Sequence, residues 1–114
     1  MQIKESIKME LKDLNSVIGV SGCEQEVGRK IKKKIEAYVD EIDISPIGNM
    51  VAKKVGHKEG PSVFVGAHMD EIGFIVKSIL PNGFLVLAKV GAVPENLLLG
   101  RKVWISNKRI PGVI

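Results

Sequence analysis

The sequence predicts a mixed α/β fold whose first part combines helices with short strands and whose last part is all β. Two observations support this prediction. Helical patterns of apolar residues occur only before Asp70, and the rest of the chain consists of short apolar runs separated by proline and glycine. This change in character predicts a boundary near Ile72, between a first domain of residues 1–72 and an all-β domain of residues 73–114.

Two amphipathic helices are expected in the first domain. Apolar residues recur at helical spacing near the start of the chain: Ile3, Ile7, Leu11 and Leu14. Residues 17–22 are too rich in glycine to continue this helix, and their glycines permit close approach of another backbone. Ser21 and Glu24 then match a capping box, which predicts a second helix that runs to about Tyr38.

Three short strands follow, each bounded by a turn signal. Residues 42–45 and 50–55 are expected to be strands on either side of the turn 46–49. A polar turn over residues 57–61, with His57 as a solvated surface residue, leads into an apolar run at residues 63–67. We expect this run to be a buried strand that ends at His68.

The all-β domain is expected to begin with a hairpin. Residues 73–79 and 84–89 form its strands, and Leu80-Pro81-Asn82-Gly83 carries proline and glycine where a tight turn needs them. Residues 91–100 make a longer connection. Residues 102–106 form another strand, in which Trp104 is expected to be packed.

Composition limits the classes of partner. Part of the net charge of +4 lies in the run Arg29-Lys30-Ile31-Lys32-Lys33-Lys34, which could mark a nucleic-acid patch or the solvated face of a helix. No aromatic residues interleave with these charges, so we expect a solvated face and no nucleic acid. The single cysteine, Cys23, and the absence of a long apolar run favour a cytoplasmic protein without a membrane partner.

The segment Ser62–Phe74 carries the candidate chemistry. It places His68, Asp70 and Glu71 within four residues, directly after the apolar run. His68 could ligate a metal ion through one ring nitrogen, while Asp70 accepts a hydrogen bond from the other. The alternative is that His68 is an ordinary histidine at a strand end and that Asp70 starts a turn.

Four motifs in order resemble one known family. Gly19-Val20-Ser21-Gly22 with Glu24, Gly48-Asn49 before a strand, Ala67-His68-Met69-Asp70-Glu71-Ile72-Gly73-Phe74 and the glycine-bounded hairpin are together similar to the N-terminal part of the M42 metallo-aminopeptidases. Many members of this family, which includes glutamyl and tetrahedral aminopeptidases, carry an older endoglucanase or cellulase label. The resemblance covers the whole chain.

The resemblance implies a fold and an activity. Members have an αβα zinc-peptidase domain with an inserted, PDZ-like β-barrel domain, so this chain would be the front part of the first and the opening strands of the second. They hold two zinc or cobalt ions and cleave short peptides from the amino end. By this match His68 would be a metal ligand and Asp70 the orienting carboxylate of the catalytic site.

The number of available ligands leads us to expect a truncated chain that is inactive alone. After Asp70 the only carboxylates are Glu71 and Glu95, and no further histidine follows. A catalytic zinc ion normally takes three protein ligands and a water molecule. In family members the remaining ligands and the glutamate that acts as general base lie further along the chain, after the inserted domain.

Two other functions are considered. A non-catalytic peptidase remnant that self-associates is compatible with the sequence and differs from the first function in lacking turnover. A glycoside hydrolase, as the older label suggests, needs two carboxyl groups that flank one bond, whereas Asp70 and Glu71 are adjacent and point to opposite faces if extended. Open strand edges and the apolar residues 110–114 predict a homo-oligomer that pairs through residues 73–114.

Overall fold

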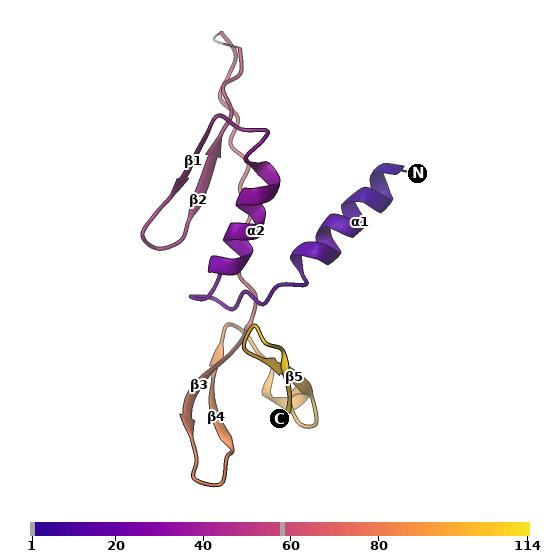
Figure 1. Ribbon diagram of the computed structural model, residues 1–114, viewed down its shortest axis with the longest axis vertical. Helices are drawn as coiled ribbons and strands as arrows, with labels where there is room; N and C mark the ends of the chain where they lie inside the picture. The colour runs from indigo at the N-terminus through magenta and orange to yellow at the C-terminus, as the bar shows by residue number, and fades with distance from the viewer. Residues whose placement is uncertain (1, 58) are drawn as a thin grey trace. The chain divides into compact units, whose positions relative to one another are not determined.

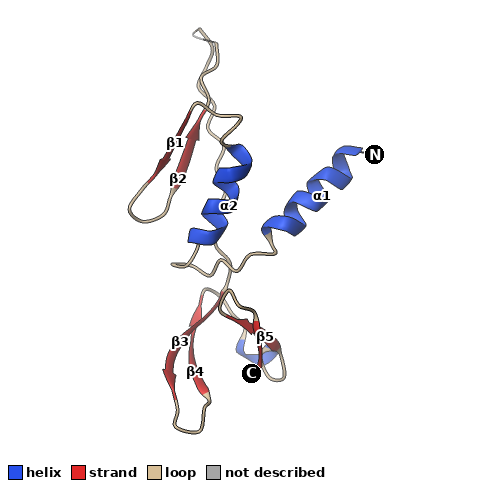
Figure 2. Ribbon diagram, viewed as in Figure 1, coloured by secondary structure: helices blue, strands red, loops and turns tan. Residues whose placement is uncertain are grey.

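The computed structural model describes residues 2–57 and 59–114, and these divide into two units (Figures 1 and 2). The first unit comprises Met1–Val17 and Glu24–Met69, and the second comprises Ile18–Cys23 and Asp70–Ile114. A short piece from the early part of the chain is therefore part of the second unit. The domain limits 1–72 and 73–114 stay a prediction.

The first unit contains the two helices that periodicity predicts. Helix α1 spans Gln2–Leu14 and helix α2 spans Gln25–Ile35, three residues shorter than expected. Val27 of α2 is 7% exposed and is the only buried hydrophobic side chain among the described residues. The apolar stripe of α1 is exposed, since Ile3 keeps 77% of its surface and Ile7 and Leu11 are also open to solvent.

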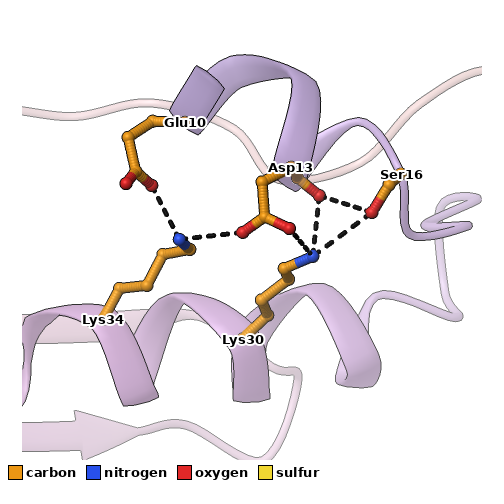
Figure 3. Close-up of polar contacts among 5 residues, drawn as sticks. All are labelled: Glu10, Asp13, Ser16, Lys30 and Lys34. Atoms are coloured by element: carbon orange, nitrogen blue, oxygen red, sulfur yellow. Dashed lines mark hydrogen bonds and ion pairs between the residues drawn. The ribbon is translucent and has the colours of Figure 1, made fainter. Parts of the chain in front are cut away.

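Charged side chains join the two helices (Figure 3). The ammonium groups of Lys30 and Lys34 lie 2.6 and 2.8 Å from the Asp13 carboxylate, and Lys34 also lies 2.7 Å from Glu10. Hydrogen bonds from Lys30 and then from Lys34 lower the pKa of Asp13, and the bonds to Asp13 and Glu10 raise the pKa of Lys34. Two lysines of the basic run are therefore paired within the fold.

A hairpin follows α2. Strand β1, Glu41–Ile44, pairs antiparallel with strand β2, Met50–Lys53, and Ile44 lies opposite Met50. In the turn between them the amide of Gly48 donates to the carbonyl of Ser45 at 2.9 Å, and Gly48 has a φ of +91°, which glycine adopts without strain. This confirms the predicted strand–turn–strand. Lys58, in the predicted polar turn, lies outside the described residues.

The expected buried strand at residues 63–67 is not formed. Val63, Phe64 and Val65 are 82%, 89% and 88% exposed, and no described residue pairs with this segment as a β-strand. A strand is stabilised by hydrogen bonds to a neighbouring strand and by cover on its faces, and the described residues provide neither. The sheets formed by residues 2–57 and 59–114 are all two-stranded and antiparallel, and none includes this segment.

The second unit is built of two hairpins. Strand β3, Gly73–Ile79, pairs antiparallel with β4, Leu85–Val90, and the register shifts between Val76 and Ser78, as in a β-bulge. The predicted turn is confirmed, because the amide of Gly83 donates to the carbonyl of Leu80 at 2.8 Å and Gly83 has a φ of +87°. A short 3₁₀ helix, η1 at Glu95–Leu97, lies in the next connection.

The last hairpin departs from expectation in two ways. Strand β5, Lys102–Ile105, was predicted, but its antiparallel partner β6, Ile110–Val113, was not. Trp104 is 60% exposed, so the expectation that it is packed is wrong. It lies opposite Pro111 on a sheet of only two strands, which cannot cover a large ring on both sides. No helix in the described part of the chain is long and apolar enough to cross a membrane.

Candidate functional site

The two predicted site residues fall in different units. His68 is exposed and lies near the end of the first unit, after the exposed apolar segment. Asp70 is partly buried and begins the stretch of the second unit that continues to the end of the chain.

Ser21 holds the Asp70 carboxylate. Its hydroxyl donates a hydrogen bond to Asp70 Oδ2 at 2.5 Å, in a partly buried position and across 49 positions of sequence. Bonds from a hydroxyl to a carboxylate are among the short, charge-assisted hydrogen bonds and are about twice as strong as neutral ones. The bond therefore fixes one oxygen of Asp70 in place.

The next residue, Glu71, is tied to the same loop. Val20 and Glu71 form an isolated parallel β-bridge, and the amide of Glu71 donates to the carbonyl of Gly19 at 2.8 Å. In return, the amide of Gly19 donates to Glu71 Oε1 at 3.2 Å. The backbone on the carboxyl side of Asp70 is therefore held by two reciprocal bonds to one residue.

Glycine at position 73 lets the loop lie this close. A Cβ atom on Gly73 would be 2.5 Å from Cγ2 of Val20, well inside ordinary van der Waals contact. Gly91, with a φ of +76°, likewise lies close to Ile72: a Cβ added to Gly91 would be 2.8 Å from Cγ2 of Ile72. We call residues 18–23, together with the segment 70–73 that they contact, the loop clamp. Its contacts confirm that the glycine-rich loop makes a close backbone approach.

Few of the described side chains are available as metal ligands. Nowhere in residues 2–57 and 59–114 do three His, Cys, Asp or Glu side chains come together as a metal site would require. Glu95 forms an ion pair with Lys89, and the hydrogen bond from Lys89 lowers the pKa of Glu95. His57 is exposed, as expected, and lies in the first unit.

The role of Ser21 was predicted wrongly. Helix α2 starts at Gln25 with Glu24 as its cap residue, and no side chain caps it by a hydrogen bond. The Ser21 hydroxyl instead donates its hydrogen to the Asp70 carboxylate, which forms a charge-assisted bond. The local pattern of Ser21 and Glu24 contains no information about a partner 49 positions away. The glycines around Ser21 were the available signal.

Comparisons with known proteins agree on one family. The family model described as M42 glutamyl aminopeptidase matches residues 48–114, more than half of the chain. A lysyl aminopeptidase of Pyrococcus furiosus is 36% identical over 86 residues, which are 75% of this chain and 24% of that protein.

Two solved structures resemble this one. A protein of Thermotoga maritima solved under the name endoglucanase has 40% identity and a TM-score of 0.83, over 90% of this chain and 32% of its own. PhTET1-12s, solved as a dodecamer in the asymmetric unit, has 34% identity and a TM-score of 0.71, over 82% of this chain and 28% of its own. The chain therefore spans about a third or less of the length of the relatives it matches. With the matching family model and these similarities in sequence and fold, the chain belongs to the M42 glutamyl aminopeptidase family.

Proposed function

We propose that this chain is the front part of a metal-dependent aminopeptidase that removes residues from the amino end of short peptides. The observation that carries the proposal is the matched segment 48–114, which contains the His68-Met69-Asp70 motif of the resemblance. The loop clamp supports it, because a carboxylate that orients another group must itself be held. The αβα zinc-peptidase domain and the inserted PDZ-like barrel at residues 73–114 are part of the same proposal.

The proposed metal ligand of this chain is His68, with Asp70 as the orienting carboxylate. A neutral imidazole supported by a carboxylate is the donor set that zinc and cobalt accept, so the two side chains fit one ligand position. Two metal ions need more ligands than the described residues group together. When bound, the metal ions would supply a water molecule of lowered pKa and would polarise the peptide carbonyl.

The limited ligand set leads us to propose that the chain alone has no peptidase turnover. One imidazole and one carboxylate are fewer than the three protein ligands of a typical catalytic zinc ion. We therefore expect weak zinc binding through His68 and no hydrolysis of aminoacyl-anilides with added zinc or cobalt. Zinc-dependent turnover that is lost in His68→Ala would contradict this expectation.

The experiment that tests the function is a hybrid enzyme. The aligned front segment of the Pyrococcus furiosus lysyl aminopeptidase is replaced by this chain, and the hybrid is assayed on aminoacyl-anilides and on cellulose with zinc or cobalt. We expect peptidase activity that disappears with His68→Ala and persists with His57→Ala, the control at the other histidine. A folded hybrid whose peptidase activity survives His68→Ala would refute the assignment.

A glycoside hydrolase remains the less favoured alternative, despite the name of the Thermotoga maritima structure. Glycosidases place two carboxyl groups about 5 to 9.5 Å apart on either side of one bond. Asp70 and Glu71 are adjacent, and each is already bonded to residues of one loop, Ser21 and Gly19. Hydrolysis of cellulose but not of peptides by the hybrid would favour this alternative.

A self-associating remnant without catalysis is the second alternative. The exposed apolar run Val63, Phe64 and Val65 favours association with other polypeptide, because contiguous apolar surface of this kind marks interaction sites. We propose a homo-oligomer that pairs through residues 73–114, and the dodecameric state of PhTET1-12s supports oligomerisation. Light scattering after size exclusion tests this, and a monodisperse monomer at tens of micromolar would contradict it. A free, exposed Cys23 supports the proposed cytoplasmic location.

A further inference from the structure

The hydrogen bond from Ser21 to Asp70 spans far more of the sequence than the bonds of Ser16, Ser45 and Ser106. Ser16 donates to the Asp13 carbonyl, three positions away, and accepts from Lys30, 14 positions away. Ser45 accepts from the amide of Asn49 and Ser106 accepts from that of Lys108, four and two positions away. These are local bonds that shape turns. Ser21 instead reaches a carboxylate 49 positions away, and it does so in a partly buried place.

We propose that Ser21 is a positioning residue, which holds the Asp70 carboxylate in the orientation needed to support His68 as a metal ligand. The proposal rests on the proposed function for the role of His68. The contact between Ser21 and Asp70, by contrast, is observed directly, with a donor–acceptor distance of 2.5 Å.

The backbone of the loop clamp is what makes Ser21 able to position another group. Val20, the residue before it, is in the β-bridge to Glu71, and its side chain lies against Gly73. Gly19 exchanges two hydrogen bonds with Glu71. Ser21 therefore projects from a segment that is anchored to the residues immediately following Asp70, so donor and acceptor are fixed within one short piece of structure.

The chemistry of the pair favours one orientation of the carboxylate. An ionised aspartate only accepts hydrogen bonds, and its two terminal oxygens are exchanged by rotation about χ2. A hydroxyl that donates to Oδ2 at 2.5 Å restricts both dihedrals of the Asp70 side chain. Loss of an outer partner of a metal ligand typically lowers metal affinity by about 10- to 100-fold, and Ser21 acts one step further out than Asp70. We therefore expect an effect at the lower end, about 10-fold.

The test compares three variants of the whole chain by NMR. Scalar couplings that report the χ1 rotamer of Asp70 are measured without metal in wild type, Ser21→Ala, Ser21→Thr and the control Ser62→Ala, an exposed serine. Zinc is then titrated while the ring signals of His68 are followed, which is practical because the chain has two histidines. Protection of the Glu71 amide from exchange shows in each variant that the loop clamp remains folded.

The expected result is specific to the hydroxyl. Ser21→Ala should average the Asp70 couplings and weaken zinc binding about 10-fold. Ser21→Thr, which keeps a hydroxyl, should retain the wild-type Asp70 couplings and zinc affinity. Ser62→Ala should change neither the couplings nor the affinity. If Ser21→Ala opens the loop clamp, the Ser21→Thr variant still tests the proposal. A threonine variant in which the Glu71 amide is protected again, but the Asp70 couplings stay averaged, would overturn it.

Two further outcomes separate this inference from the proposed function. Unchanged Asp70 couplings in a folded Ser21→Ala chain would overturn the role of Ser21. Averaged couplings with an unchanged zinc affinity would also overturn it, because Ser21 would then hold Asp70 without serving His68. If the wild type shows no zinc-dependent change at His68, the expectation that His68 binds zinc in this chain alone fails, and the couplings then decide whether Ser21 holds Asp70.

Discussion

Replacing Gly73 by alanine should disrupt the loop clamp more than the size of the change suggests. The added Cβ would lie 2.5 Å from Cγ2 and 3.4 Å from Cγ1 of Val20. Carbon atoms in good contact are about 3.5 to 4.0 Å apart, so the two segments must separate by about 1 Å or more. Valine is β-branched and has little freedom to rotate out of the way.

The magnitude follows from two contributions. Overpacking by one methyl group in a tight place costs about 1 to 3 kcal/mol. Separation also stretches the bonds between Gly19 and Glu71, now 2.8 and 3.2 Å long, and each such bond contributes about 0.5 to 1.5 kcal/mol net. The two costs are not added, because the segments either stay together and bear the overlap or separate and lose the bonds. We therefore expect the free energy of the loop clamp to change by about 1 to 3 kcal/mol.

The assay is amide hydrogen exchange at Glu71, with urea unfolding as the global measure. Exchange reports the opening free energy of this one contact, which a global transition of a chain with two units would blur. Val20→Ala removes both overlapping methyl groups and should rescue most of the loss in the double variant. Gly28→Ala is the matched control, since no atom lies within 4 Å of its added Cβ, and in helix α2 it should stabilise by up to about 1 kcal/mol.

A clear result would refute this reasoning. If Gly73→Ala leaves the protection of the Glu71 amide unchanged, the approach of Val20 is not tight enough to matter. If Val20→Ala fails to rescue a destabilised Gly73→Ala chain, the loss has a cause other than steric overlap.

Three more predictions follow from single contacts. Because the pKa of Asp13 is lowered in the folded chain, its ion pairs stabilise the fold above the ordinary value of 3.8, and this stabilisation is lost as the pH falls through the lower folded pKa. Carboxyl NMR should therefore show Asp13 titrating below 3.8, and acid should release α1 from α2. Titration at or above 3.8 would contradict the ion pairs. Gly91→Ala should destabilise the second unit by about 1 to 3 kcal/mol in urea, because it combines a φ of +76° with a contact to Ile72, and an unchanged midpoint would argue against both. Trp104, 60% exposed, should emit at long wavelength and be quenched by iodide in the monomer, whereas a shielded, blue-shifted emission would show that a partner covers it.

Local patterns in the sequence predicted the local elements well. The turn Leu80-Pro81-Asn82-Gly83 holds the information for its own geometry, so the hairpin of β3 and β4 was found with bounds within a residue. Both helices were found from the spacing of apolar residues. Strand β6 was missed because Pro111 and Gly112 are unfavourable in strands, although a proline is tolerated at a sheet edge.

Features that depend on distant residues were not predictable in this way. The apolar run at residues 63–67 predicts a buried strand, but burial requires cover from other segments, and the described residues leave Phe64 89% exposed. Ser21 was interpreted as a helix cap for the same reason, since its partner Asp70 lies far along the chain. For the candidate site, His68 and Asp70 stay a prediction from the pattern, and the bond that holds Asp70 to residues 18–23 was not predicted.

The loop clamp also constrains how the second unit can form. Its Ser21–Asp70 bond joins residues 49 positions apart, and closing a flexible loop of that length costs about 3.5 kcal/mol by the logarithmic length term. A neutral hydrogen bond returns only about 0.5 to 1.5 kcal/mol, and one to a charged group about 1.5 to 3 kcal/mol, so no single bond of the clamp can close the loop alone. The contacts of Gly19, Val20 and Ser21 must therefore form together, after the local hairpins and as one cooperative step. When the loop clamp opens, these contacts should therefore be lost together, so that residues 18–23 leave the second unit as a block.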